Sequence, residues 1–211
     1  MMGEIIMEIN KHKVFISYYH DEDQPYKDYL CDVLNFDHEL FDDYSVRDGE
    51  IDDELDAETI RTKIRDEYIK EATVLVLLCG PNTKHRKYID WEIHASMYDT
   101  EKNPKMGIIV VNLPKSGNGV RAASNIEKEV ISPNSSWTSF TTLKQFEDAY
   151  SSAPKRIINS LFYKQSEISF VDWETIKNNP NKLKLLIDIA YSRRKDVDYY
   201  LADPLMRRNG N

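Results

Sequence analysis

Residues 72–79 read Ala-Thr-Val-Leu-Val-Leu-Leu-Cys, a run that contains no charged side chain. A short run of this kind is expected where helices cover both faces of a parallel strand. Gly80-Pro81-Asn82 follows the run and ends it. Residues 106–112, Met-Gly-Ile-Ile-Val-Val-Asn, repeat the same apolar pattern. The two runs therefore predict two strands that are buried on both faces.

Further strands and helices alternate around these two runs. Residues 13–18 form an apolar run that stops in polar residues, and Leu40-Phe41 with the acids after it indicates a short second strand. Apolar residues recur at helical spacing in residues 26–34, 54–70 and 86–99. Strands that alternate with helices predict an α/β protein with a doubly wound parallel sheet of the flavodoxin-like type.

The chain changes character after this alternation. Residues 113–142 contain Gly, Pro, Ser and Asn and are predicted to form long loops. Helical periodicity returns at residues 143–150, 154–163 and 181–194. We therefore expect an α/β domain over residues 1–142 and a helical C-terminal extension, residues 143–211, packed on it.

Charge and composition exclude several classes of protein. The net charge is −8, and residues 37–71 hold 14 acidic against 5 basic side chains. Phosphate contacts need clustered Lys and Arg, so we expect no nucleic-acid partner. No apolar run approaches the roughly 20 residues of a membrane span, and residues 1–10 do not resemble a signal peptide. With two cysteines, expected to be reduced thiols, the chain is predicted to be cytoplasmic.

Residues 88–93, Tyr-Ile-Asp-Trp-Glu-Ile, open the helix that follows the strongest strand. Ligands of such sheets bind beyond the carboxyl ends of the strands, which places this segment at the expected binding edge. Tyr88 and Glu92 are four residues apart and share a helix face. A carboxylate between Tyr88 and Trp91 suits a sugar beside a flat base, but a Glu that only solvates a helix end fits equally. Trp91 either stacks on a base or belongs to the core.

These segments resemble a TIR domain. Residues 14–19, Val-Phe-Ile-Ser-Tyr-Tyr, are similar to its first strand, and residues 41–43 to its second. An aromatic residue four positions before Glu92 resembles the catalytic helix of NAD-cleaving TIR domains, although Tyr88 stands where Trp is usual. Within TIR domains, residues 11–115 are similar to the bacterial TIR-like branch that includes ThsB of the Thoeris antiphage system.

The resemblance implies an NAD⁺ glycohydrolase or cyclase that breaks the nicotinamide–ribose bond. NAD⁺ would be the substrate, with no cofactor and no metal, and Glu92 the catalytic carboxylate. The product would be ADP-ribose or a cyclic ADP-ribose isomer, sensed as a signal by a separate effector protein. Self-association is expected for activity, because TIR enzymes commonly complete the active site from two protomers.

The resemblance and the sheet edges also suggest residues for substrate binding. The end of the first strand, the second strand with its following loop, and the helix with Glu92 supply the candidates. They are Ser17, Tyr18, Tyr19, His20, Asp42, Arg47, Tyr88 and Trp91. His20 fits a general base but equally an ordinary polar residue, and Arg47 fits a phosphate contact or a pair with nearby acids. The basic residues 84–87 form either a pyrophosphate site or a solvated rim.

Two other functions remain open at this stage. The chain fits a non-catalytic TIR module that acts by protein interaction, although Glu92 with Tyr88 favours the enzyme. It also fits an enzyme similar to nucleoside deoxyribosyltransferases, which would use a similar carboxylate on nucleosides. Cys79 follows the strongest strand, but its apolar surroundings predict an inert thiol rather than a nucleophile.

Overall fold

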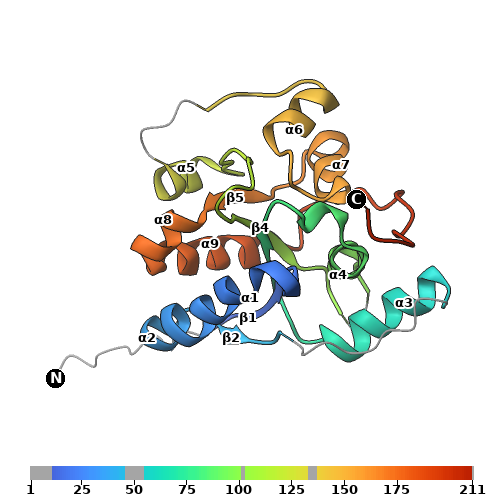
Figure 1. Ribbon diagram of the computed structural model, residues 1–211, viewed down its shortest axis with the longest axis horizontal. Coiled ribbons are helices and arrows are strands. Elements are labelled where there is room, and N and C mark those ends of the chain that lie inside the picture. Colours follow the sequence, from blue (N-terminus) through green and yellow to red (C-terminus); the bar gives the residue numbers. More distant parts are fainter. Residues whose placement is uncertain (1–10, 46–54, 101–102, 133–136, 211) are drawn as a thin grey trace.

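The computed structural model describes residues 11–45, 55–100, 103–132 and 137–210, and contains one parallel sheet with the strand order β2-β1-β3-β4-β5 (Figure 1). The strands are β1 (Lys13–Ser17), β2 (Asp42–Asp43), β3 (Val74–Cys79), β4 (Gly107–Asn112) and β5 (Ser169–Asp172). Every residue of β3 and β4 is buried, as their apolar runs predict. This order confirms the flavodoxin-like doubly wound fold.

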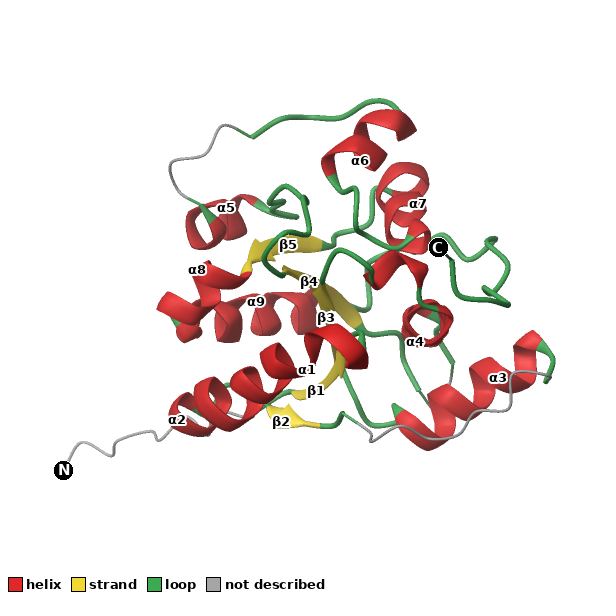
Figure 2. Ribbon diagram, in the orientation of Figure 1, coloured by secondary structure: helices red, strands yellow, loops and turns green. Residues whose placement is uncertain are grey.

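Helices cover both faces of the sheet, so the core has two layers (Figure 2). One face packs against α1 (His20–Asp28), its π-helical continuation η1 (Tyr29–Asn35), α5 (Asn125–Ile131), α8 (Trp173–Asn178) and α9 (Pro180–Arg193), with α2 (Phe36–His38) at the end of η1. The other packs against α3 (Ala57–Lys63), η2 (Ile64–Tyr68), α4 (Lys87–Met97), α6 (Leu143–Ala149) and α7 (Lys155–Lys164). Among the described residues, no helix is long and apolar enough to cross a membrane.

A glycine lets α9 lie directly on the sheet. Gly107 begins β4, and a Cβ placed on it would lie 2.3 Å from the backbone oxygen of Ala190 in α9. That separation is far below van der Waals contact, so a side chain here would push the helix away from the strand. Gly107 therefore sets the distance between β4 and α9.

The C-terminal part of the chain contains a strand in addition to the predicted helices. The predicted helices are present as α6, α7 and α9, but residues 169–172 form β5, which pairs with β4 and completes the sheet. Helix α5 also lies in the region expected to be loops, and its N-terminus carries a capping box between Ser124 and Glu127. The division of the chain at residue 142 stays a prediction.

Candidate active site

Helix α4 is buried from Ile89 to its end, except at Glu92. From Ile89 to Met97 every residue except Glu92 is buried, and Glu92 is partly exposed. The helix follows β3, so it begins at the carboxyl edge of the sheet, where ligands of this fold bind. A partly exposed Glu flanked by buried residues on both sides stands at a defined position rather than on a solvated helix face.

The first strand supplies a direct partner for this carboxylate. Ser17, the last residue of β1, is buried and donates a hydrogen bond of 2.6 Å from Oγ to Glu92 Oε2. A hydrogen bond to an ionised acceptor is stronger than one between two neutral groups, and it favours one orientation of the carboxylate. Two residues that lie 75 positions apart in the sequence are thus brought together, as the sheet-edge argument predicts.

Tyr19 joins the same edge to the start of α4. Its ring lies 3.7 Å from the guanidinium carbon of Arg86, the residue that precedes α4. Its hydroxyl donates to Asp21 Oδ2 at 2.6 Å, and this bond raises the pKa of Tyr19. A cation held over an aromatic face is stabilised by the ring quadrupole. The junction between β1 and α1 therefore touches α4 at two points, Ser17–Glu92 and Tyr19–Arg86.

Tyr18 and His20 contact each other on the side of the sheet that faces α1 and α9. Side chains alternate along a strand, and the alternation that places Ser17 and Tyr19 toward α4 turns Tyr18 to the opposite face. Tyr18 packs against the core layer formed with α1 and α9, and its ring stacks on His20 with the centroids 4.1 Å apart. Its hydroxyl donates to Gln24 Oε1 at 2.7 Å. The described contacts therefore join Ser17 to Glu92 and Tyr19 to Arg86, and stack Tyr18 on His20.

The two aromatic residues beside Glu92 differ in exposure. Tyr88 is 44% exposed and lies one helical turn before Glu92, while Trp91 is fully buried. The Trp91 indole donates from Nε1 to the backbone oxygen of Met206 at 2.7 Å, and Tyr88 meets its ring edge-on. Tyr88 thus stays partly exposed beside Glu92, with the Lys87 ammonium 5.0 Å from the centroid of its ring. Trp91 belongs to the core, which decides the alternative that the sequence leaves open.

Strand β2 ends before it reaches the carboxyl end of β1, where Ser17 lies. Asp42 pairs with Lys13 at the opposite end of β1 from Ser17 and is exposed. Four residues of strand, roughly 13 Å, separate that level from Ser17. The structure therefore does not bring Asp42 to Glu92, because β2 is short and ends early. Arg47 lies outside the described residues.

The basic residues before α4 have separate environments. Lys84 donates from Nζ to the backbone oxygen of Ser151 at 2.8 Å. It lines a surface cavity of about 410 Å³ together with Lys144 and Lys155, while Ser17, Tyr19 and Glu92 do not line that cavity. Lys144 in turn pairs with Asp148. Of this basic group, Arg86 is the residue in direct contact with the β1 edge.

Cys79 has the character of a structural thiol. It is fully buried at the end of β3, and burial raises its pKa to about 12. Its sulfur donates to the backbone oxygen of Ser152 at 3.3 Å and accepts from Asn118 Nδ2 at 3.3 Å. A thiol with so high a pKa stays protonated at neutral pH and is a poor nucleophile.

The interaction between Asp90, two residues before Glu92, and Arg156 could not be predicted from the sequence. Asp90 forms an ion pair with Arg156 of α7, and both side chains are buried. Arg156 Nε and Nη2 donate to the two Asp90 oxygens at 3.0 and 3.1 Å. An uncompensated charge would be costly at this depth, so the pair fixes α4 against α7. No local sequence pattern connects the two residues, which are 66 positions apart.

The comparison with protein families agrees with this arrangement. Residues 15–118 match the family model described as the TIR-like domain of the Thoeris protein ThsB. The matched segment runs from the last three residues of β1 past the end of β4 and includes α4, and so contains Ser17, Tyr19, Arg86 and Glu92. No protein of curated function matches the chain.

Proposed function

Residues 15–118 form a TIR-like domain of the ThsB family, and from that premise we propose that the chain cleaves the nicotinamide–ribose bond of NAD⁺ as part of a Thoeris antiphage system. The observation behind the proposal is the position of Glu92. Glu92 is the one partly exposed residue in the buried stretch Ile89–Met97 of α4, at the carboxyl edge of the sheet, and the Ser17 hydroxyl donates a hydrogen bond to it. A carboxylate held in this way is ready to act without a metal or a resident cofactor.

Cleavage of the nicotinamide–ribose bond produces positive charge on the ribose, which the enzyme must stabilise. Nicotinamide in NAD⁺ is a cationic leaving group that departs as a neutral base, and the bonding electrons go with it. Positive charge then develops on the ribose, between C1′ and the ring oxygen, and an ionised carboxylate near C1′ stabilises it. Glu92 takes this role in the proposal. Hydrogen bonds from its oxygens to the ribose hydroxyls would align the sugar.

The nucleophile that captures the ribosyl cation decides the product. Attack by water, with loss of a proton, gives ADP-ribose. Attack by a group of the same molecule gives a cyclic ADP-ribose isomer. We propose a cyclic product, in line with a signalling role in which a separate effector protein senses it.

The surrounding side chains suit the rest of the substrate. Tyr88 offers a half-exposed ring one turn from Glu92, on which a flat nicotinamide or adenine ring can stack. Arg86 adds a positive charge beside Tyr19 that favours the pyrophosphate. Both residues are at the rim of the helix that presents Glu92. We further propose that a second protomer completes this open site.

The test is the release of nicotinamide from NAD⁺ by the purified chain, followed by chromatography over a range of protein concentrations. Glu92→Gln keeps the size of the side chain and removes its charge, and should abolish release. Glu174→Gln, an exposed carboxylate on α8 at the other face of the sheet, is the matched control and should leave release unchanged. Mass spectrometry and NMR of the product then identify ADP-ribose or the cyclic isomer.

Three results would overturn the proposal. Nicotinamide release that persists in Glu92→Gln would remove this residue from the reaction. Release of free base from deoxynucleosides, with NAD⁺ left intact at every protein concentration, would instead assign an activity similar to nucleoside deoxyribosyltransferases. A chain that self-associates without acting on either substrate, also in extracts of phage-infected cells, would be an interaction module.

A further inference from the structure

The last residues of the chain run along α4, the helix that presents Glu92. Met206 donates from its backbone nitrogen to Asp90 Oδ2 at 2.9 Å and accepts at its oxygen from the Trp91 indole at 2.7 Å. Asn209 Oδ1 accepts from the backbone nitrogen of Lys87, the first residue of α4, at 3.0 Å. The segment of residues 203–209, here called the C-terminal strap, therefore contacts Asp90 and Trp91, the two residues that precede Glu92, and the first residue of α4.

We propose that the C-terminal strap is a positioning element for Glu92, which fixes both where α4 begins and how the helix is rotated. The inference rests on the proposed function for its catalytic consequence. The strap itself does not touch the Glu92 carboxylate in any described contact. It acts through the buried side of α4, while the carboxylate projects from the side that meets Ser17.

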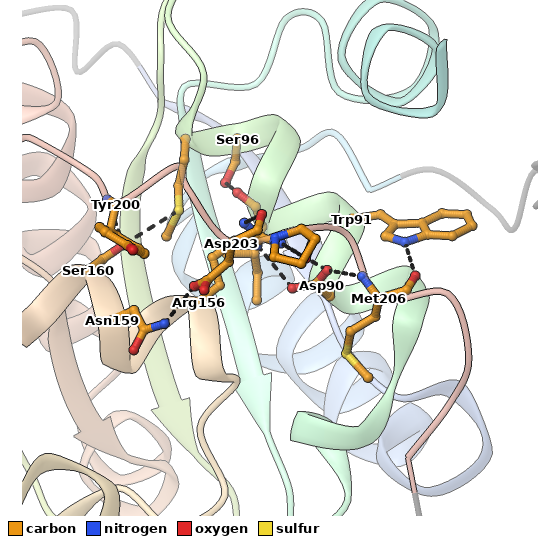
Figure 3. A network of polar contacts seen from close by, with 12 residues as sticks. Asp90, Trp91, Ser96, Arg156, Asn159, Ser160, Tyr200, Asp203 and Met206 are labelled. Atoms are coloured by element: carbon orange, nitrogen blue, oxygen red, sulfur yellow. Dashed lines mark hydrogen bonds and ion pairs between the residues drawn. The ribbon is translucent and has the colours of Figure 1, made fainter. Parts of the chain in front are cut away.

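A buried arginine anchors the start of the strap. Arg156 is 1% exposed, and besides the Asp90 carboxylate it donates to the backbone oxygens of Asp203 and Pro204, each at 3.1 Å (Figure 3). Asn159, one turn along α7, donates to Asp203 Oδ2 at 2.7 Å. One guanidinium thus holds α4 and the strap together, and its planar set of donors suits several acceptors at once.

The far end of the strap supplies the cap that α4 lacks. The N-cap residue is Arg86, whose side chain makes no capping hydrogen bond. The first N–H groups of a helix have no partner inside the helix, and Asn, Asp, Ser or Thr normally accepts from them. Asn209 does so for Lys87 from 122 positions away in the sequence. A cap supplied in this way couples the start of α4 to the end of the chain.

The rotation of α4 decides whether Glu92 can work. Successive helical residues are turned by about 100°. Asp90 and Trp91, held by the strap, therefore fix the direction of Glu92. Displacement of a catalytic group by ~1 Å can cost about 100-fold in rate. Loss of the strap should lower kcat, and KM should rise with it, since Tyr88 and Arg86, which are proposed to bind NAD⁺, stand at the same end of α4.

The mildest test is Asn209→Ala, which removes one acceptor from an exposed residue and is compatible with folding. Amide exchange in the first turn of α4, measured by mass spectrometry, should rise about fivefold because the cap is lost. The kcat for nicotinamide release should fall three- to tenfold, and KM should rise, because Tyr88 lies in the same turn of α4. Asn209→Asp keeps the acceptor and should restore both values. Arg208→Ala changes an exposed neighbour in the strap and is the matched control.

A second variant removes residues 203–211 altogether. It should lose at least 90% of kcat, and a synthetic peptide of residues 203–211 added at rising concentration should restore activity to a plateau. Unchanged kcat in both Asn209→Ala and the shortened chain would overturn the positioning role. Unchanged amide exchange in both would overturn the hold of the strap on α4. If the unaltered chain releases no nicotinamide, the proposed function fails, and amide exchange alone decides the inference.

Discussion

The Ser17 hydroxyl lies 2.6 Å from Glu92 Oε2 and donates a hydrogen bond to it, which joins the end of β1 to the middle of α4. Ser17 is 1% exposed, so solvent cannot take over as the donor if the hydroxyl is removed. A buried side chain from another element of the fold thus helps to orient the carboxylate.

Ser17→Ala should therefore impair the reaction more than the fold. Loss of one oriented donor near developing charge commonly costs about 100-fold in rate, and we expect kcat for nicotinamide release to fall by about 10- to 100-fold. Stability should change by about 1 kcal/mol or less, as for one hydrogen bond. Steady-state kinetics and urea unfolding measure both. Ser96→Ala removes an equally buried hydroxyl that donates within α4, and its kcat should match the unaltered chain. Equal kcat in both variants would contradict the role of Ser17.

Strands β3 and β4 and helix α4 were accessible to sequence reasoning because their signals are local. The runs that became β3 and β4 are apolar throughout, and the pair Ser17 and Glu92 follows from the rule that ligands bind at the carboxyl edge. β5 has only two apolar residues, Phe170 and Val171, within four, and a run this short gives no periodic signal.

The arrangement around Glu92 was less accessible because it depends on tertiary contacts. Period-two alternation, applied along β1, would have separated Ser17 and Tyr19 from Tyr18 before the structure was known. Trp91 could not be assigned, because an aromatic residue serves a core or a ligand equally well. Its hydrogen bond to Met206, 115 positions away, has no counterpart in any local pattern. Long-range polar contacts of this kind appear only once the fold is known.

Arg86 gives a second kinetic prediction, which concerns binding rather than chemistry. Its guanidinium is held 3.7 Å from the Tyr19 ring centroid at the entrance of the site. Arg86→Ala removes the charge proposed to favour the pyrophosphate, so KM for NAD⁺ should rise about tenfold, the equivalent of ~1.4 kcal/mol, with a smaller effect on kcat. Arg86→Lys should give an intermediate KM, because it keeps the charge and loses the planar stack. Lys184→Ala on α9, at the other face, is the control. An equal rise in KM for that control would show a general effect of net charge.

Gly107 allows a prediction about the fold alone. A Cβ at this position would lie 2.3 Å from the Ala190 backbone oxygen, and backbone cannot move aside as a flexible side chain can. Gly107→Ala should force α9 away from β4 and destabilise the protein by about 2 kcal/mol or more, as overpacked cores do. Gly119→Ala is the matched control, because its Cβ would make an ordinary contact of 3.6 Å with the Ala149 oxygen. A urea midpoint for Gly107→Ala as high as that of Gly119→Ala would show that α9 shifts without cost.

Asp23 predicts how stability depends on pH. Its side chain is 4% exposed, and its Oδ2 has no hydrogen-bond partner among the described residues. Burial, with a further contribution from the charge of Glu22, raises the pKa of Asp23 from 3.8 to about 6. Between these values the folded protein holds a proton that the unfolded chain releases. Stability from this group is therefore complete below pH 3.8 and is lost as the pH rises through about 6.

Asp23→Asn removes the ionisable group while it keeps the size of the side chain. The variant should unfold at about the same urea concentration as the unaltered chain at pH 4, and should be more stable at pH 7.5 by about 3 kcal/mol, since each pKa unit corresponds to ~1.4 kcal/mol. Urea unfolding of both proteins between pH 4 and 8 measures the difference, in which the contributions of all other carboxylates cancel. A difference that stays constant across this range would mean that the Asp23 carboxyl ionises in the folded protein as it does in water, and that its burial costs nothing.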